Sequence, residues 1–94
     1  MSNKQLLEAL SQDLYRVAIG LHSGSTKMAE RFSKEILDRK EELELETLKP
    51  YIRKIITNLP QTLSQQDSKK AAEDALVYSI LLQNYSLSAS FKNT

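Results

Sequence analysis

The chain has 94 residues, of which 40% are hydrophobic and 27% charged, and its formal net charge is +1. This length suits a single small domain, and two glycines and two prolines are too few for a turn-rich β fold. The near-neutral charge argues against a surface for nucleic acid or anionic membranes, and the lack of cysteine excludes disulfides and thiolate metal sites. No apolar run is long enough for a signal peptide or a membrane span. We therefore expect one all-α cytoplasmic domain over residues 1–94.

The first predicted helix begins after Ser2 or Asn3, because either side chain can cap a helix. Leucine and valine then recur at spacings of three and four residues, which is typical of one buried helical stripe. The stripe consists of Leu7, Leu10, Leu14, Val17 and Leu21. The helix ends near Gly20 or near Gly24, since either glycine can take the left-handed conformation that follows a last turn.

The second predicted helix begins at Ser25 or Thr26 and is mostly charged. Its apolar residues fall within one narrow arc and are Met28, Ala29, Phe32, Ile36 and Leu43. Opposite charges four residues apart, such as Glu30 and Lys34, stabilise an exposed helical face by ~0.2–0.5 kcal/mol per pair. This pattern predicts a helix with one side on the core and the other in water.

A third, short helix is predicted at about Leu48 to Leu59, after a sharp corner. Its stripe consists of Leu48, Ile52, Ile55 and Leu59. In one continuous helix this stripe would lie roughly 150° around from the stripe of the second helix, so the two could not face the same core. Pro50 supplies the break, because proline disfavours helical geometry at the residue before it and is tolerated in a first turn. The alternative is one long kinked helix whose two halves serve different chains.

The polar segment from Pro60 to Gln66 predicts a loop, in which Ser64 and Asp67 have the spacing of a capping box. A fourth helix follows and extends to about Tyr85. The residues at about 86–94 are rich in serine and predict a flexible tail.

The fourth helix carries two apolar stripes on opposite faces, where a surface helix carries one. One stripe consists of Ala71, Ala75, Tyr78, Leu82 and Tyr85, and the other of Leu76, Ile80 and Leu87. We expect Leu76 and Ile80 in the core, which leaves part of the helix exposed as an interaction patch. The predicted patch consists of Tyr78, Leu81, Leu82 and Tyr85. A twofold homodimer is the commonest way to cover such a patch, and another protein is the alternative.

We predict no catalytic, cofactor-binding or metal-binding site. The segment from Gly20 to Lys27 lacks the glycine spacing and the preceding strand of a phosphate-binding loop. Glu42 and Glu46 lie one helical turn apart, but carboxylate metal sites in bundles add histidine and draw on several helices. The basic residues form only short pairs without interleaved aromatics, so we expect no nucleic acid as a partner.

Arg16 is followed six residues later by His22, the only histidine of the chain. This spacing resembles the catalytic motif of the HEPN ribonucleases, which are helical bundles, and the resemblance covers seven residues. It implies a ribonuclease in which Arg16 and His22 act together across a dimer. Within one helix, six residues turn through about 240°, so the two side chains would not share a face. A histidine near a helix C-terminus, where its partial charge is favourable, is the structural alternative.

The sequence thus predicts an all-α fold: a small antiparallel bundle of four helices with a short third helix after Pro50, closed by one chain or completed by dimerisation. Its expected core consists of Leu7, Leu10, Leu14, Val17, Phe32, Ile36, Ile52, Ile55, Leu59, Leu76 and Ile80. The function that fits best is a protein–protein interaction or regulatory module that self-associates through its last helix. The alternatives are a HEPN-like ribonuclease or toxin component and a bundle like the bacteriocin immunity proteins, the latter by analogy of size and helicity.

Overall fold

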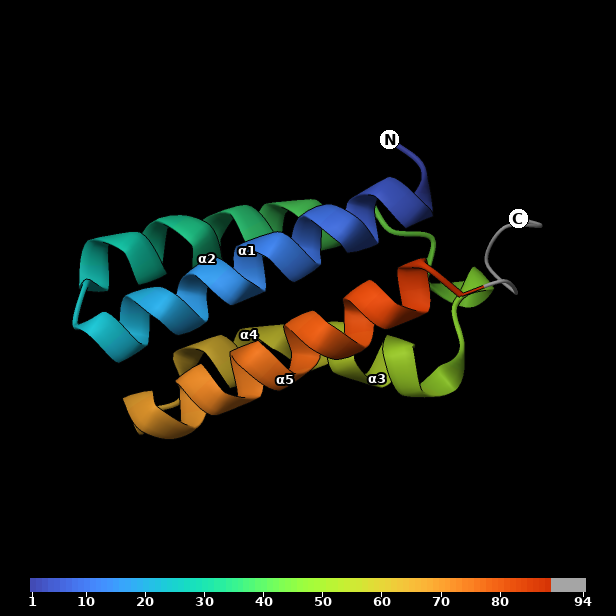
Figure 1. Cartoon of the computed structure of the whole chain (residues 1–94). Coiled ribbons are helices and arrows are strands. Elements are labelled where there is room, and N and C mark those ends of the chain that lie inside the picture. The colour runs from blue at the N-terminus through green and yellow to red at the C-terminus, as the bar shows by residue number, and fades with distance from the viewer. Residues whose placement is uncertain (89–94) are drawn as a thin grey trace.

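A computed structural model describes residues 1–88, and in this range the chain forms helices and no strand. The all-α prediction is confirmed. The elements are α1 (Asn3–Ser23), α2 (Thr26–Lys40), the 3-10 helix η1 (Leu45–Thr47), α3 (Pro50–Thr57), α4 (Leu59–Ser64) and α5 (Ser68–Ser86), as Figure 1 shows.

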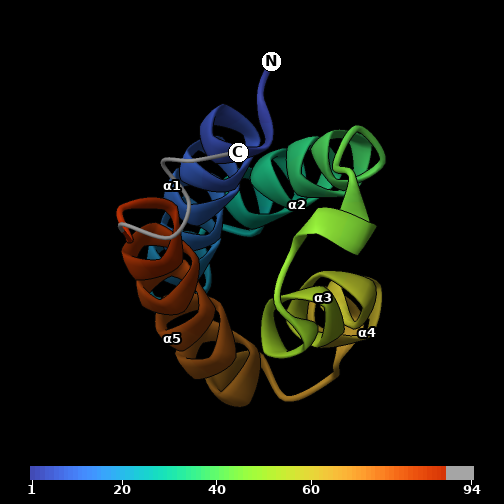
Figure 2. The same ribbon diagram turned by 90° about the vertical axis from the view of Figure 1, so that its right-hand side faces the viewer.

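The helices surround a common core, which is seen end-on in Figure 2. Helix α1 packs on α2 and, most extensively, on α5. Helices α3 and α4 follow one another on the side away from α1, where α4 contacts both α2 and α5. Helix α1 therefore lies between α2 and α5 and makes the most extensive contacts of the fold with these two helices.

Both ends of α1 are fixed by local sequence. Ser2 and Gln5 form a capping box, in which the Ser2 hydroxyl accepts from the Gln5 amide and the Ser2 amide donates to Gln5 Oε1. The helix ends at Gly24, whose φ of +81° is left-handed. Gly20 lies inside the helix, and a Cβ there would stand 3.0 Å from the backbone nitrogen of Ala29. Its role is to let α2 approach α1.

Most of the residues that were predicted to form the core are buried. The fully or almost fully buried members of the predicted set are Leu7, Leu10, Leu14, Val17, Ile36, Ile52 and Leu59. Phe32 and Ile55 are only partly buried and pack at its edge. The prediction was wrong for Leu76 and Ile80, which are 42% and 50% exposed. The core is instead closed from the α5 side by Ala75, Leu82 and Tyr85.

The corner before Pro50 is present. Helix α2 ends at Lys40, and α3 begins at Pro50 with Lys49 as its N-cap, so this chain does not form one long kinked helix. Two hydrogen-bonded contacts hold the intervening segment. The Asn3 side chain accepts from the Glu44 amide (3.0 Å) and donates to the Glu44 carbonyl (3.1 Å) and to Thr47 Oγ1 (2.7 Å). The Tyr85 hydroxyl accepts from the Lys49 amide at 3.2 Å.

The predicted loop from Pro60 to Gln66 is wrong, because α4 occupies most of it. Pro60 has no N–H to continue α3, so α3 ends at Thr57 and a new helix begins with Pro60 in its first turn. The Asn58 amide bonds the carbonyl of Lys54 and closes α3, and its carbonyl accepts the first bond of α4 from Thr62. Leu59 is buried, so the short helix contributes to the core.

The last helix differs from its prediction at its start. Its N-cap is Asp67, whose carboxylate accepts from the amides of Lys69 and Lys70, and Ser64 plays no part in this cap. At the other end α5 ends at Ser86, one residue after the predicted end at about Tyr85. Ser86 is fully buried and so is not part of a flexible tail, and residues 89–94 of the predicted tail lie outside the described range.

Candidate interaction surface

Helix α5 buries mainly small side chains together with Leu82 and Tyr85, and it leaves most of its large aliphatic side chains exposed. Its buried residues are Ala71, Ala75, Ser79, Leu82, Tyr85 and Ser86. Its exposed large apolar residues are Leu76, Val77, Ile80, Leu81 and Leu87, which we call the α5 patch. Between 37% and 59% of each patch residue is exposed. If α5 served only the folding of this chain, its larger apolar residues would be expected on the buried side. The exposure of the α5 patch therefore needs a separate explanation.

The small inward residues explain why the patch is not needed in the core. Alanine and serine allow two helix backbones to approach closely, and they make up most of the buried residues of α5, which packs most extensively on α1. The buried hydroxyls bond within their own helix, Ser79 to the carbonyl of Leu76 at 2.7 Å and Ser86 to that of Gln83 at 2.8 Å. These serines therefore pack as small residues without an unsatisfied polar group.

Two hollows lie along the outer side of the contact between α1 and α5. One has a volume of about 630 Å³ and is bordered by Tyr15, Leu76, Ile80 and Leu87 among others. The other has a volume of about 790 Å³ and is bordered by Tyr15, Ile19 and Leu76 among others. Tyr15 and Leu76 border both, so the two hollows lie next to each other, and we call them together the outer groove. Tyr15 is 51% and Ile19 39% exposed, which extends the apolar surface from α5 onto α1.

Polar residues border the two ends of the outer groove. The first hollow carries Glu8, Gln83 and Arg16, whose guanidinium is paired with Asp13. The second hollow carries His22, Lys69 and Glu73. The groove therefore has apolar residues along its middle and charged residues of both signs beside them.

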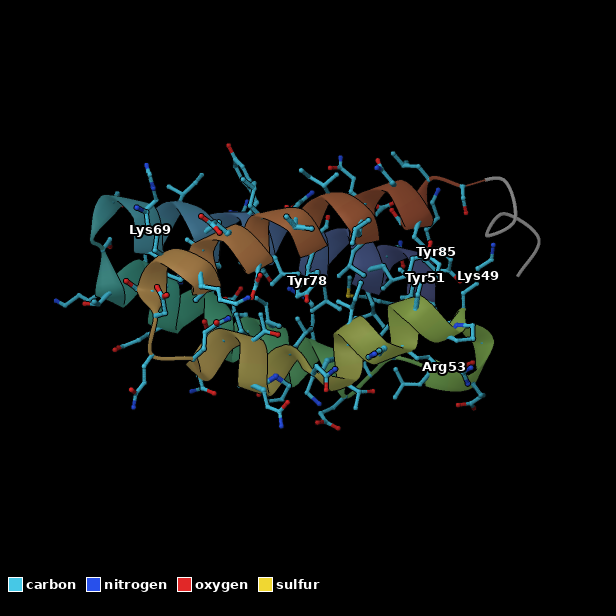
Figure 3. All side chains as sticks on the ribbon, turned by 90° about the horizontal axis from the view of Figure 1, so that it is seen from below. Lys49, Tyr51, Arg53, Lys69, Tyr78 and Tyr85 are labelled. Atoms are coloured by element: carbon cyan, nitrogen blue, oxygen red, sulfur yellow. The ribbon has the colours of Figure 1, made fainter. Side chains whose placement is uncertain are left out.

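Only one of the four predicted patch residues belongs to the α5 patch. Leu82 and Tyr85 are 0% and 7% exposed, so the expectation that they remain accessible was wrong. Tyr78 is partly buried and lies on the side of α5 that faces α3 and α4 (Figure 3). Leu81 is exposed and lies in the patch. The doubled stripe predicted an exposed apolar face correctly but assigned it to the wrong side of the helix.

Tyr85 is instead part of a structural contact at the C-terminal end of α5. Its ring meets the ring of Tyr51 edge-on, with centroids 6.1 Å apart, and its hydroxyl bonds the Lys49 amide. Figure 3 shows these three residues together at one end of the molecule. The contact positions the start of α3, so the inward face of α5 serves folding.

Arg16 and His22 are not brought together within one chain. The Arg16 guanidinium lies 3.3 Å from Asp13 Oδ1 and 5.2 Å from the centroid of the Phe32 ring of α2, and Arg16 also borders the first hollow of the outer groove. His22 lies in the last turn of α1 and borders the second hollow of the outer groove. The geometry expected for one helix is thus observed, and Arg16 has a structural role.

Asp13 is a buried carboxylate that the sequence analysis did not single out. Its Oδ2 accepts a 2.8 Å bond from Arg39, which fastens α2 to α1. Burial raises the pKa of Asp13 above its ordinary value, and this effect outweighs the lowering by Arg39 and Arg16, while Glu35 adds to the rise. An aspartate at the edge of an apolar helical stripe, with arginines nearby in the fold, is the signal that could have revealed it.

Residues 1–88 contain no candidate metal site and no candidate membrane span. Among residues 1–88, His, Asp and Glu side chains do not gather in a group of three or more that could hold a metal ion. No helix in the same range is both long and apolar enough to cross a membrane. No model of a protein family, no curated protein sequence and no solved structure matches the chain, so its function has to be inferred from its own surface.

Proposed function

We propose that this protein is a small interaction or regulatory module, without catalytic activity, that binds another protein chain through the outer groove. The observation that carries the proposal is the order of side chains on α5, where Leu76, Val77 and Ile80 are exposed while Ala75 and Ser79 are buried. Contiguous apolar surface of this kind on a small domain usually marks a binding site. The lack of cysteine suits a reducing compartment, so we place the protein in the cytoplasm.

The packing of the helices supports the interpretation that the α5 patch is a surface outside a closed core. It is not a part of the core that lacks its cover. We interpret the arrangement as an antiparallel bundle of four segments, in which α3 and α4 together take the third position. Leu82 and Ala75 of α5 then meet Leu7, Leu10 and Leu14 of α1 inside one chain, all of them fully buried. The chain therefore closes its own core, and the patch remains available for a partner.

The size of the apolar surface sets what a partner has to cover. Burying a whole Leu or Ile side chain is worth about 1.5–3 kcal/mol, so covering half of one gives about 1 kcal/mol. The α5 patch alone then gives about 5 kcal/mol, which is near the lower end of the 4–15 kcal/mol, roughly, that association costs. A stable partner therefore also covers Tyr15 and Ile19 on α1.

The proposal is tested by comparing two charge-introducing variants in cells. Ile80→Glu places a carboxylate in the middle of the outer groove, and Gln61→Glu places the same charge on the exposed side of α4. We expect proteins that co-purify with the tagged parent chain to be lost from Ile80→Glu and retained by Gln61→Glu. Circular dichroism checks that both variants keep their helix content. If Ile80→Glu retains every co-purifying protein, the proposed surface is wrong.

A further inference from the structure

We infer that the partner is a second copy of this chain, bound so that the two α5 helices run antiparallel across a twofold axis level with Tyr78. This inference rests on the proposed function and adds the identity of the partner and the geometry of its contact. It is carried by the distribution of apolar and charged residues along the outer groove.

The apolar residues of the α5 patch are self-complementary in this arrangement. Two antiparallel helices related by a twofold axis level with residue 78 place each residue opposite the one at the same distance on the other side of the axis. Leu76 then meets Ile80 of the second copy, and the reciprocal pair forms as well. These two residues are 42% and 50% exposed and both border the outer groove, so the central contact is apolar on both sides.

The charges on α5 favour the antiparallel over the parallel direction. Residues 75–88 contain no charged side chain, and the charges of α5 are confined to Lys69, Lys70, Glu73 and Asp74. A parallel pair would place Glu73 beside Glu73 and Lys69 beside Lys69, and like charges at such positions repel. An antiparallel pair places Glu73 beside Gln83 of the second copy, and Lys69 beside its Leu87. The lysine then also lies at a helix C-terminus, where a positive charge is stabilising.

The ends of the outer groove bring one favourable charge pair together in the same arrangement. The twofold axis exchanges the ends, so Glu8 of the first hollow meets the end of the second copy that carries His22, Lys69 and Glu73. Lys69 is the charge opposite to Glu8 in that set, whereas Arg16 of the first hollow stays paired with Asp13 of its own chain. One surface of this chain therefore matches itself in apolar content at the centre, and Glu8 can pair with Lys69 of the second copy at each end.

Sedimentation equilibrium and light scattering test the second copy as the partner. At tens of micromolar we expect the parent chain and Gln61→Glu to be dimers. We expect Ile80→Glu to raise the dissociation constant by more than about tenfold, because its carboxylate would be buried against Leu76. Circular dichroism establishes that Ile80→Glu stays folded; if it unfolds, Tyr15→Glu at the edge of the same contact replaces it. A parent chain that is monomeric at this concentration overturns the inference.

Single cysteines test the direction of the helices, since the natural chain has no cysteine that could interfere. Glu73→Cys and Gln83→Cys variants, mixed and oxidised, are expected to form a disulfide between the two variants. Each variant alone is expected to remain uncrosslinked, because ten residues of helix separate it by about 15 Å from the same residue of the second copy. A disulfide requires Cα atoms within about 7 Å. Strong crosslinking of either variant with itself indicates a parallel pair and overturns the inferred arrangement.

The outcomes separate this inference from the proposed function. A monomeric parent chain whose co-purifying proteins are lost in Ile80→Glu overturns self-association, and the interaction function still stands. A monomeric parent chain whose co-purifying proteins all survive Ile80→Glu overturns both. A dimer that crosslinks only between Glu73→Cys and Gln83→Cys supports the inference.

Discussion

Asp13 makes the stability of the protein depend on pH in a direction opposite to that of most aspartates. Burial raises its pKa above the ordinary 3.8, so between 3.8 and the raised value the folded chain binds more protons than the unfolded chain. The free energy of unfolding that Asp13 contributes therefore falls as pH rises through this interval, and stays at the lower level above it.

Replacing Asp13 by Asn should remove this pH dependence. At neutral pH we expect a change of less than about 1 kcal/mol, because the neutral amide avoids the cost of burying a charge and its oxygen can still accept from Arg39. Urea unfolding of the parent chain and of Asp13→Asn, from about pH 4 to pH 7, measures both effects. Identical slopes of stability against pH in the two proteins would contradict the assigned pKa direction.

His22 should be dispensable for folding and for activity. It is exposed, and Arg16 is bound to Asp13 and stacked on Phe32 elsewhere on α1. We expect His22→Ala to change stability by less than about 0.5 kcal/mol. Because His22 lies at the rim of the outer groove and not in its centre, the same variant should weaken binding through the groove only slightly and leave the cellular phenotype of the protein intact. A loss of phenotype with unchanged circular dichroism would favour the ribonuclease alternative.

At the scale of the elements, Gly20 sets the distance between α1 and α2. Helix propensity alone predicts that Gly20→Ala stabilises an α-helix by about 0.5–1 kcal/mol. The added Cβ would, however, stand 3.0 Å from the backbone nitrogen of Ala29 and 3.2 Å from the carbonyl oxygen of Ser25, and backbone atoms cannot move aside as a side chain does. We therefore expect net destabilisation of about 1 kcal/mol in thermal unfolding. A variant more stable than the parent chain would refute the close approach.

Asn3 should control the order of the segment between α2 and α3. Asn3→Ala removes one acceptor and two donor bonds to Glu44 and Thr47, and should cost about 1–2 kcal/mol. Hydrogen exchange at residues 44–48 should become faster. Asn3→Asp is the matched control, because it keeps the acceptor for the Glu44 amide and should give a smaller increase. Equal exchange rates in the parent chain, Asn3→Ala and Asn3→Asp would show that the hydrogen bonds of Asn3 do not order this segment.

At the scale of the whole molecule, the two faces of α5 should respond oppositely to charge. Tyr85→Glu places a carboxylate in the core and removes the aromatic contact with Tyr51, so we expect the chain to lose most of its stability. Ile80→Glu lies on the exposed face and should leave the melting temperature of the monomer nearly unchanged. A thermal melt of each variant checks the contrast. If Tyr85→Glu melts like Ile80→Glu, the inward face of α5 has been wrongly assigned.

The structure could be predicted from the sequence where it depends on the periodicity of apolar residues or on one helix-breaking proline. One apolar stripe predicted the buried side of α1, and Pro50 predicted the corner before α3, whose start at Pro50 lies two residues after the predicted start at about Leu48. The sequence was insufficient at Pro60, because a proline ends one helix and can equally begin the next. The polar residues after it therefore looked like a loop, although Leu59 and Leu63 follow helical spacing and face the core.

The side of α5 that faces the core could not be read from periodicity. Both faces are apolar, so their phase predicts two stripes and leaves open which one is buried. The choice depends on how closely α5 approaches α1, which is a property of the assembled helices. The buried face could have been recognised from three small residues at four-residue spacing, because such residues permit two helices to approach closely. These residues are Ala71, Ala75 and Ser79. The larger size of Leu76 and Ile80 pointed the sequence analysis to the wrong face.

The extensive contact between α1 and α5 also determines when the protein can fold during its synthesis. Helix α1 ends at Ser23, and the helix that covers most of its apolar stripe begins only at Ser68. Leu7, Leu10 and Leu14 therefore leave the ribosome long before their main neighbours exist, and α2 can cover only part of them. The nascent chain has to keep these leucines out of wrong contacts, alone or bound to a chaperone, until α5 emerges. We therefore expect α5, the helix that also carries the α5 patch, to complete the core in a late step of folding.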